Sequence, residues 1–159
     1  MQKFTSASAE RAAQGAFERV RQRSMGVADE ILAEEGGAMD DASFALAVGS
    51  PVAGLLAQAS AHQFFFIEHG GARHWPQWQL GLSGLPAILT VLGAKGAQGF
   101  SIANFFLCPT DVLYFSVEDP RRAGVRKNDS PLTLLRRVGL PAVGLVIQHA
   151  ERFGEHGAT

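Results

Sequence analysis

Apolar residues recur at helical spacing through most of the chain, and this periodicity predicts a mainly helical protein. In the N-terminal third we expect helices over residues 8–24, 27–35, 41–48 and 51–61. Asp40 and Asp41 are suited to cap the third helix, and glycines at 36, 37 and 49 are suited to end helices. The apolar residues that we expect to face inward from the third and fourth helices are Phe44, Leu46, Val48, Val52, Leu55 and Leu56.

The hydrophobic period changes after residue 62. The segment QFFFIEH-GG-ARHWP reads as two short strands joined by the two-residue turn Gly70-Gly71, which is a strong local signal for a β-hairpin. Helix, glycine turn, helix and hairpin together outline a helix-turn-helix with a wing. We therefore predict a mainly α fold, a helical bundle with an N-terminal helix-turn-helix and a small β-hairpin wing. A small helical C-terminal domain follows, and the two regions span residues 1–80 and 81–159.

The second half of the chain predicts further short helices. One covers residues 85–92, a glycine-rich link covers 93–99, and a helix over 100–107 ends before Pro109. Asp129-Ser130-Pro131 combines a cap residue with a proline that the first helical turn accepts, and Gly139 ends the helix that starts there. Pro141 opens a last helix. Two short amphipathic helices around a glycine stop provide a surface for packing or docking.

Composition narrows the class of protein. With 47% hydrophobic and 18% charged residues, the chain is globular, and its net charge of −1 provides no overall attraction to nucleic acid or anionic lipid. No apolar run approaches the roughly 20 residues that span a bilayer, and the N-terminus has no secretory signal. The single cysteine, Cys108, fits a reducing compartment, so we expect a cytoplasmic protein with Cys108 buried.

The distribution of charge disfavours DNA binding by the predicted helix-turn-helix. No lysine or arginine lies between Arg23 and Arg73, whereas that stretch holds seven acidic residues. Affinity for DNA depends mainly on cations that neutralise phosphates. We therefore favour a helix-turn-helix retained as a packing or dimerisation platform. Its small residues, which would let another helix approach closely, are Ala53, Gly54, Ala57 and Ala59.

Cations gather instead in an insert over residues 114–128. Together with Arg73, the candidates for contact with DNA or another anion are Arg121, Arg122, Arg126 and Lys127. The alternative is a solvated, mobile loop that Glu118 and Asp119 partly neutralise.

The sequence holds little that indicates catalysis or metal binding. His62, His69 and His74 surround the hairpin without the spacing of a zinc site, and no nucleophile elbow, P-loop or dinucleotide fingerprint is present. We therefore expect no enzyme activity, metal or cofactor. Trp75 and Trp78 are expected to pack in the core or at a hinge.

An ordered series of residues resembles the toxin-binding domain of the Xre/MbcA/ParS antitoxin family. The series also includes WPQWQL at 75–80, and the resemblance extends from about Gly36 to the C-terminus; the matching residues are Phe105, Phe106, Leu107, Pro109, Leu113, Asp129, Pro131, Leu132, Leu135, Arg136, Val143, Ala150, Phe153 and Gly154. The insert at 114–128 departs from the family, in which only a few residues separate the part of the series that ends at Leu113 from the part that begins at Asp129.

The resemblance implies an antitoxin-like interaction protein. In that family the C-terminal domain binds a RES-domain toxin, an enzyme that degrades NAD, and this domain occludes the toxin's active site. The N-terminal domain supports oligomerisation and operator binding. By this resemblance we expect a cognate RES-domain toxin as partner, and self-association. The residues expected to bind the toxin are Leu132, Leu135, Arg136, Arg137, Val146, His149 and Phe153. The alternatives are a DNA-binding transcriptional regulator and a dimeric scaffold that has lost DNA binding.

Overall fold

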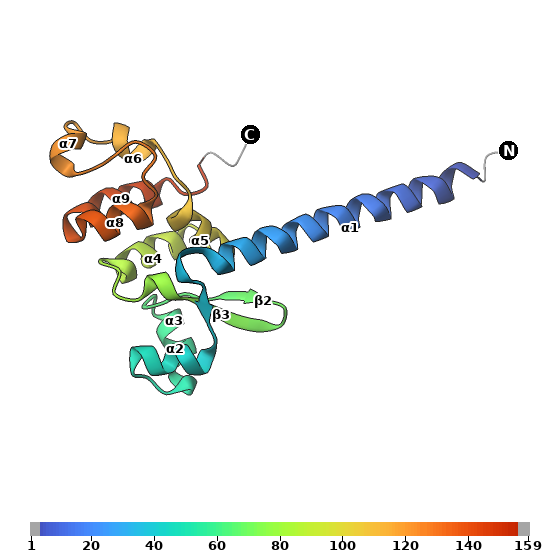
Figure 1. Ribbon diagram of the computed structural model, residues 1–159, viewed down its shortest axis with the longest axis horizontal. Helices are drawn as coiled ribbons and strands as arrows, with labels where there is room; N and C mark the ends of the chain where they lie inside the picture. Colours follow the sequence, from blue (N-terminus) through green and yellow to red (C-terminus); the bar gives the residue numbers. More distant parts are fainter. Residues whose placement is uncertain (1–3, 156–159) are drawn as a thin grey trace.

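The computed structural model describes the backbone of residues 4–155, and within that range the side chains except those at 4–7, 17, 20–25 and 121. The N-terminal segment forms one helix, α1 (Phe4–Ala33), where the sequence predicted two. Gly26 keeps a helical backbone and does not break it. Among the described side chains of α1, those that join the core are buried Ala28 and half-buried Ile31 and Leu32 in its last turns. The N-terminal part of the helix extends away from the body (Figure 1).

Two short helices at a right angle follow α1. They are α2 (Asp41–Val48) and the segment formed by the 3₁₀ turn η2 (Val52–Gly54) and α3 (Leu55–Ser60), and they meet at 89°. The Asp40 carboxylate accepts a hydrogen bond from the Ser43 N–H at 2.7 Å and caps α2, as its position predicts. Gly49 ends α2 with φ +68°, a conformation that most side chains disfavour.

The predicted hairpin is confirmed. Strands β2 (Ile67–His69) and β3 (Ala72–Pro76) pair in antiparallel register, with Glu68 opposite Arg73. Gly70 and Gly71 join them with φ +61° and +76°. A short strand that the sequence did not predict, β1 (Ala38–Met39), pairs with the other edge of β3 and gives the order β1-β3-β2. The hairpin is thereby tied to the end of α1.

The remaining helices form a compact C-terminal bundle. Its elements are α4 (Leu85–Ala94), α5 (Gly99–Leu107), α6 (Val112–Phe115), α7 (Pro120–Ala123), α8 (Pro131–Val138), the 3₁₀ turn η4 (Leu140–Ala142) and α9 (Val143–Glu151). Two further 3₁₀ turns precede the bundle, η1 (Glu34–Gly36) before β1 and η3 (Gln77–Gln79) after β3. Helix α4 packs on α9, and α5 packs on α8. Ser130 caps α8 by accepting a hydrogen bond from the Thr133 N–H at 3.1 Å, and Gly139 ends it. The helices predicted around 85–92, 100–107 and 131–138 are confirmed, and so is the mainly helical class with a small hairpin.

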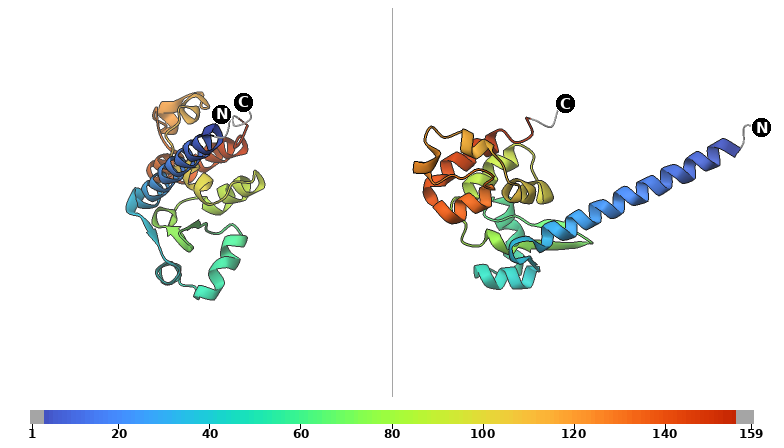
Figure 2. Two further views of the ribbon diagram at one scale, coloured as in Figure 1. Left: turned by 90° about the vertical axis from the view of Figure 1, so that its right-hand side faces the viewer. Right: turned by 45° about the horizontal axis from the view of Figure 1, so that its top comes forward.

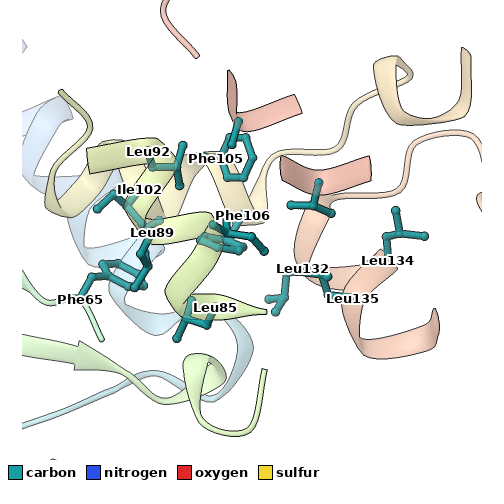
Figure 3. Close-up of a cluster of buried hydrophobic side chains, with 14 of the residues drawn as sticks. Phe65, Leu85, Leu89, Leu92, Ile102, Phe105, Phe106, Leu132, Leu134 and Leu135 are labelled. Carbon is teal, nitrogen blue, oxygen red and sulfur yellow. The ribbon is translucent and has the colours of Figure 1, made fainter. Parts of the chain in front are cut away.

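Two hydrophobic clusters hold the molecule together. The larger one joins α4, α5, α8 and α9, and Figure 3 shows Phe106 between the leucines of α4 and those of α8. Phe65, Ile67 and Trp78 also belong to it, so residues from before position 80 pack with the C-terminal bundle. The smaller cluster consists of Phe44, Ala45, Leu55 and Trp75. The rings of Phe44 and Trp75 stack at 4.7 Å.

Three residues predicted to face inward are instead exposed. Leu46 is 85% exposed, Val52 47% and Leu56 45%. Phe44 and Leu55 fill the small cluster with Trp75, and helices of this length have one buried side, so the other side points to solvent. The inward prediction for Leu46, Val52 and Leu56 was wrong for that reason.

No single helix in the described part of the chain combines the length and apolar character of a membrane span. Helices α2 and η2–α3 reach that composition only as a pair bent by 89°.

Candidate partner-binding surfaces

Three of the residues expected to contact a partner lie in the core. Leu132, Leu135 and Val146 are at most 2% exposed and pack in the larger cluster. Their helical spacing reflects burial against α4 and α5, and not a face presented to a second protein. These three residues are therefore corrected from partner contacts to core residues.

Arg137 is an internal anchor. Its guanidinium forms a bidentate ion pair with the buried Asp129 carboxylate, and it also donates to the Gly124 carbonyl at 2.6 Å. Burial raises the pKa of Asp129, but hydrogen bonds from Arg137 and from the Arg126 N–H outweigh it and hold the pKa below its ordinary value. Arg137 thus ties α8 to the end of the insert. Its neighbour Arg136 is therefore the cation of α8 that is more available to a partner.

Arg136 lies at the surface. Its guanidinium pairs with Glu35 at 2.5 Å, and both side chains are more than 40% exposed. The pair connects α8 to the turn that follows α1. An exposed ion pair of this kind is easily exchanged for contacts with a partner.

His149 and Phe153 are only partly accessible. The His149 ring stacks on Phe105 at 5.1 Å, and its Nδ1 atom is buried without a hydrogen-bond partner among the described residues. Burial, with a smaller contribution from Arg152, lowers the pKa of His149. Phe153 is half-buried against the larger cluster. Both side chains mainly pack the C-terminal end of α9 against the larger cluster.

The C-terminal half also has exposed apolar side chains that the sequence did not predict. Leu140 is 73% exposed, Phe115 70% and Val112 39%. Leu140 follows Gly139 at the end of α8. Gly139 belongs to the lining of a groove of about 500 Å³, whose residues are Glu35, Gln77, Trp78, Leu80, Gly81, Leu82, Ser83, Leu135, Arg136 and Gly139. A leucine between a helix-ending glycine and a proline was the available signal for an exposed apolar residue.

The cations of the insert lie far from α2 and α3. Figures 1 and 2 place α7 at the opposite end of the body from those helices. Arg122 pairs with Asp119 at 3.4 Å, and the Lys127 ammonium lies 5.7 Å from the centre of the Tyr114 ring. Arg126 is exposed, and the side chain of Arg121 lies outside the described residues. The insert therefore adds no positive charge to the α2–α3 unit.

Arg73, the cation of the hairpin, is engaged by Asp41. Its Nη2 and Nε atoms donate to the carboxylate at 2.7 and 3.2 Å, and the Trp75 indole donates to the same carboxylate at 2.7 Å. The Arg73 hydrogen bonds, followed by that from Trp75, lower the pKa of Asp41. These hydrogen bonds fix the hairpin to α2, and the Asp41 carboxylate neutralises the positive charge of Arg73.

The outward side of α2 and α3 is an apolar surface without charge. From residue 42 to residue 67 the sequence contains no Asp, Glu, Lys or Arg. We call the exposed residues from position 42 to position 61 the charge-free patch: Ala42, Ser43, Leu46, Ala47, Gly49, Pro51, Val52, Ala53, Leu56, Ala57, Ser60 and Ala61. Asp40 and Glu68 lie outside it and line a groove between α2 and the hairpin, which meets the patch at Ala42.

The isolated cysteine and the histidines occupy ordinary positions. Cys108 is exposed, which corrects the expectation of burial, because α5 ends there and the chain turns outward at Pro109. His69 pairs with Asp29 at 3.4 Å, and the His74 ring contacts the His69 carbonyl. Across the described residues, no three His, Cys, Asp or Glu side chains are grouped as a metal site would require.

Comparisons with known proteins add a likeness of fold. No protein-family model matches the chain, and no curated protein matches it. Among solved structures, the chain is similar to the NMR structure of Rv2175c, with a TM-score of 0.55 and 22% identity over 76% of this chain and 82% of that one. At this identity the likeness concerns the fold alone.

Proposed function

We propose that this protein is an antitoxin-like interaction module that binds a RES-type, NAD-degrading toxin and blocks its active site. The proposal depends on the resemblance of residues 36–159 to the Xre/MbcA/ParS family. The structural observation that supports it best is the surface at the end of α8. There, the exchangeable Arg136 and Gly139 line an open groove of about 500 Å³, and exposed Leu140 follows Gly139 in the chain.

This surface has the parts of a binding hot spot. An apolar anchor next to an arginine is a common centre of protein interfaces, because the anchor loses water on binding while the arginine supplies directed hydrogen bonds. The groove between α8 and the segment at 77–83 offers room for a side chain of the partner. The mechanism is steric, and the protein itself catalyses no reaction in this proposal.

Co-expression with the product of the neighbouring gene tests the proposal. We expect a complex that co-purifies, and we expect NAD loss in cells that express the toxin alone but not in cells that express both. Leu140→Asp and Arg136→Ala should weaken the complex, whereas Leu46→Asp, an exposed leucine on α2, is the matched control that should not. A neighbour without NAD-degrading activity and without a complex would refute the proposal.

DNA binding is the second candidate, since α2, α3 and the hairpin have the layout of a winged helix-turn-helix. The absence of lysine and arginine between residues 23 and 73 and the engagement of Arg73 argue against it. A gel shift on the upstream region of the gene, at low and high salt, separates the two. We expect no shift, and a salt-sensitive shift at micromolar protein would favour a regulator.

A further inference from the structure

A pocket of about 450 Å³ lies where the two hydrophobic clusters meet. One side of it consists of residues of the larger cluster, including Phe65, Leu89 and Ile102, which Figure 3 labels. The other side includes Ala59 and Phe66, which pack against the smaller cluster. Small molecules commonly bind in pockets of this size at the junction of two packed units.

Three half-buried phenylalanines, Phe64, Phe66 and Phe100, line the pocket. The Phe64 ring meets the Phe44 ring edge to face at 5.2 Å, and the Phe66 ring packs on Trp75 at 5.0 Å. These contacts with the smaller cluster fix both rings in place. The pocket therefore offers aromatic surface that is ordered before a ligand arrives, and the faces of aromatic rings attract cations.

Glu68 supplies the formal charge of the pocket. Among the Asp, Glu, Lys and Arg residues that the structure describes, it alone belongs to the lining. Its cross-strand neighbour Arg73 is engaged by Asp41, and Glu68 takes part in no ion pair within the described part of the chain. An aromatic pocket with such a carboxylate is complementary to a cation with an apolar body, and it repels an anion.

His62 lines the same pocket from a backbone conformation that most side chains disfavour. It follows α3 with φ +59°, and its N–H donates to the Ala59 carbonyl at 3.1 Å. Glycine adopts this conformation freely and is the usual residue at such a helix end. The His62 ring forms no hydrogen bond with any described residue, so its nitrogens are available to a ligand. A role as helix stop alone does not explain a histidine at this position.

Gly93 on α4 makes room for the same ring. A Cβ atom at position 93 would lie 2.7 Å from Cε1 of His62, which is closer than van der Waals contact allows. Glycine within a helix is less favourable than alanine. Two positions, one after α3 and one on α4, thus hold residues that the local backbone disfavours, and both place one imidazole in the wall of the pocket. Departures from local preference of this kind are typical of functional sites.

We propose that this pocket binds a small organic cation, an amine with an aromatic or branched apolar body. The apolar body replaces water between the phenylalanines, the positive charge lies near Glu68, and His62 offers a hydrogen-bond acceptor from the side of α4. Because the ligand contacts residues of both clusters, binding stabilises the contact between the α2–α3 unit and the C-terminal bundle. The pocket shares no lining residue with the groove at the end of α8, so this site does not depend on the toxin proposal.

An NMR titration of the full ¹⁵N-labelled chain tests the site with three probes of one shape: benzylammonium, benzyl alcohol and benzoate. For benzylammonium we expect saturable amide shifts at residues 62–68, 93 and 97–100. The Kd should be on the order of 1 mM, as suits a probe of this size. Benzyl alcohol, which lacks the charge, should bind about 5-fold more weakly, and benzoate should leave these amides unchanged. Equal binding of the cation and the anion, or shifts confined to residues outside the pocket, would overturn the proposal.

A fourth probe, N-acetyl-lysine methylamide, separates a free ligand from a side chain of a partner protein. It carries the same charge on a thin, flexible stem and should bind more weakly than benzylammonium. Tighter binding of this probe would assign the pocket to a lysine of a partner protein and would contradict a small-molecule site.

Two variants identify the groups that bind the ligand. Glu68→Gln should weaken the binding of benzylammonium by about 3- to 10-fold and leave that of benzyl alcohol unchanged. Glu118→Gln, the matched change at an exposed glutamate of the insert, should alter neither. An equal loss of both probes on Glu68→Gln, or the same loss on Glu118→Gln, would count against a charge-selective pocket.

His62→Gly separates binding from folding. Glycine fits φ +59° better than histidine, so the melting temperature of the free protein should not fall, while the binding of benzylammonium should weaken. The ¹⁵N spectrum of each variant checks that it folds. Unchanged binding together with a lower melting temperature would show that the ring only packs between α3 and α4, and the proposal would then be wrong.

Discussion

Arg137→Ala should destabilise the fold strongly, whereas Arg136→Ala should not, although the two arginines are neighbours on the same helix. Arg137 forms a bidentate pair with Asp129, whose side chain is 6% exposed, and donates to the Gly124 carbonyl. Removing the guanidinium leaves a buried carboxylate with only the Arg126 N–H as hydrogen-bond donor at 2.8 Å. The desolvation cost of Asp129 is then no longer offset.

The magnitude follows from these contacts. Breaking a buried ion pair costs about 3–5 kcal/mol, and since the Arg137 side chain is itself 27% exposed, we reduce this to about 2–4 kcal/mol. In a protein of this size that corresponds to a fall in Tm of roughly 4–16 °C, at about 2–4 °C per kcal/mol. The Arg136–Glu35 pair is more than 40% exposed on both sides, so its loss should cost about 0–1 kcal/mol.

Urea unfolding followed by tryptophan fluorescence measures both variants, because Trp75 and Trp78 are buried in the two hydrophobic clusters. A double-mutant cycle with Asp129→Asn isolates the coupling between Arg137 and Asp129. The pKa of Asp129 is lowered in the folded state, so this contribution is present above its ordinary pKa of 3.8 and is lost as the pH falls through the lower folded value. Equal destabilisation by Arg136→Ala and Arg137→Ala, or a coupling near zero, would refute the reasoning.

Three further outcomes are expected. Burial lowers the pKa of His149, so as the pH falls this histidine is protonated more readily in the unfolded state than in the folded state, and stability should fall as the pH drops below 6.5. His149→Phe should reduce the fall in the urea midpoint that is measured between about pH 7.5 and pH 5.5. Phe44→Ala should cost about 3–5 kcal/mol in urea unfolding, whereas Leu46→Ala, two residues away but exposed, should change the monomer by less than about 0.5 kcal/mol; similar costs would contradict the assigned faces of α2. Gly71→Ala should cost about 1 kcal/mol in thermal melts because φ is +76° with no atom crowding the position, and an unchanged Tm would contradict that strain.

Local signals in the sequence were sufficient for most elements of the fold. Caps such as Asp40 and Ser130, and glycines such as Gly49 and Gly139, act within a few residues, so their positions fix helix ends without knowledge of the tertiary structure. The Gly70-Gly71 turn specified the hairpin for the same reason. Strand β1 escaped prediction because two residues hold no periodicity, and only pairing with β3 makes them a strand.

The candidate surfaces needed the tertiary structure. Helical spacing shows which residues of a helix lie on its apolar side, but not whether that side meets the core or a partner. Because α8 packs on α5 and α9 packs on α4, Leu132, Leu135 and Val146 are buried in the core. The same ambiguity made Leu46 and Leu56 look buried. The neighbouring arginines differ only because the fold brings Asp129 to one and Glu35 to the other.

The sequence by itself determined the ends of helices with a strong cap or stop residue, such as α2 and α8, the hairpin, and the lack of positive charge between residues 23 and 73, because each of these depends on residues close along the chain. Only the tertiary structure decided which apolar residues are left outside. With Phe44, Leu55 and Trp75 filling the small cluster, the remaining apolar residues of α2 and α3 have no room in it and form the charge-free patch. Burial is a property of the whole packed molecule, and periodicity reports only which residues share a side.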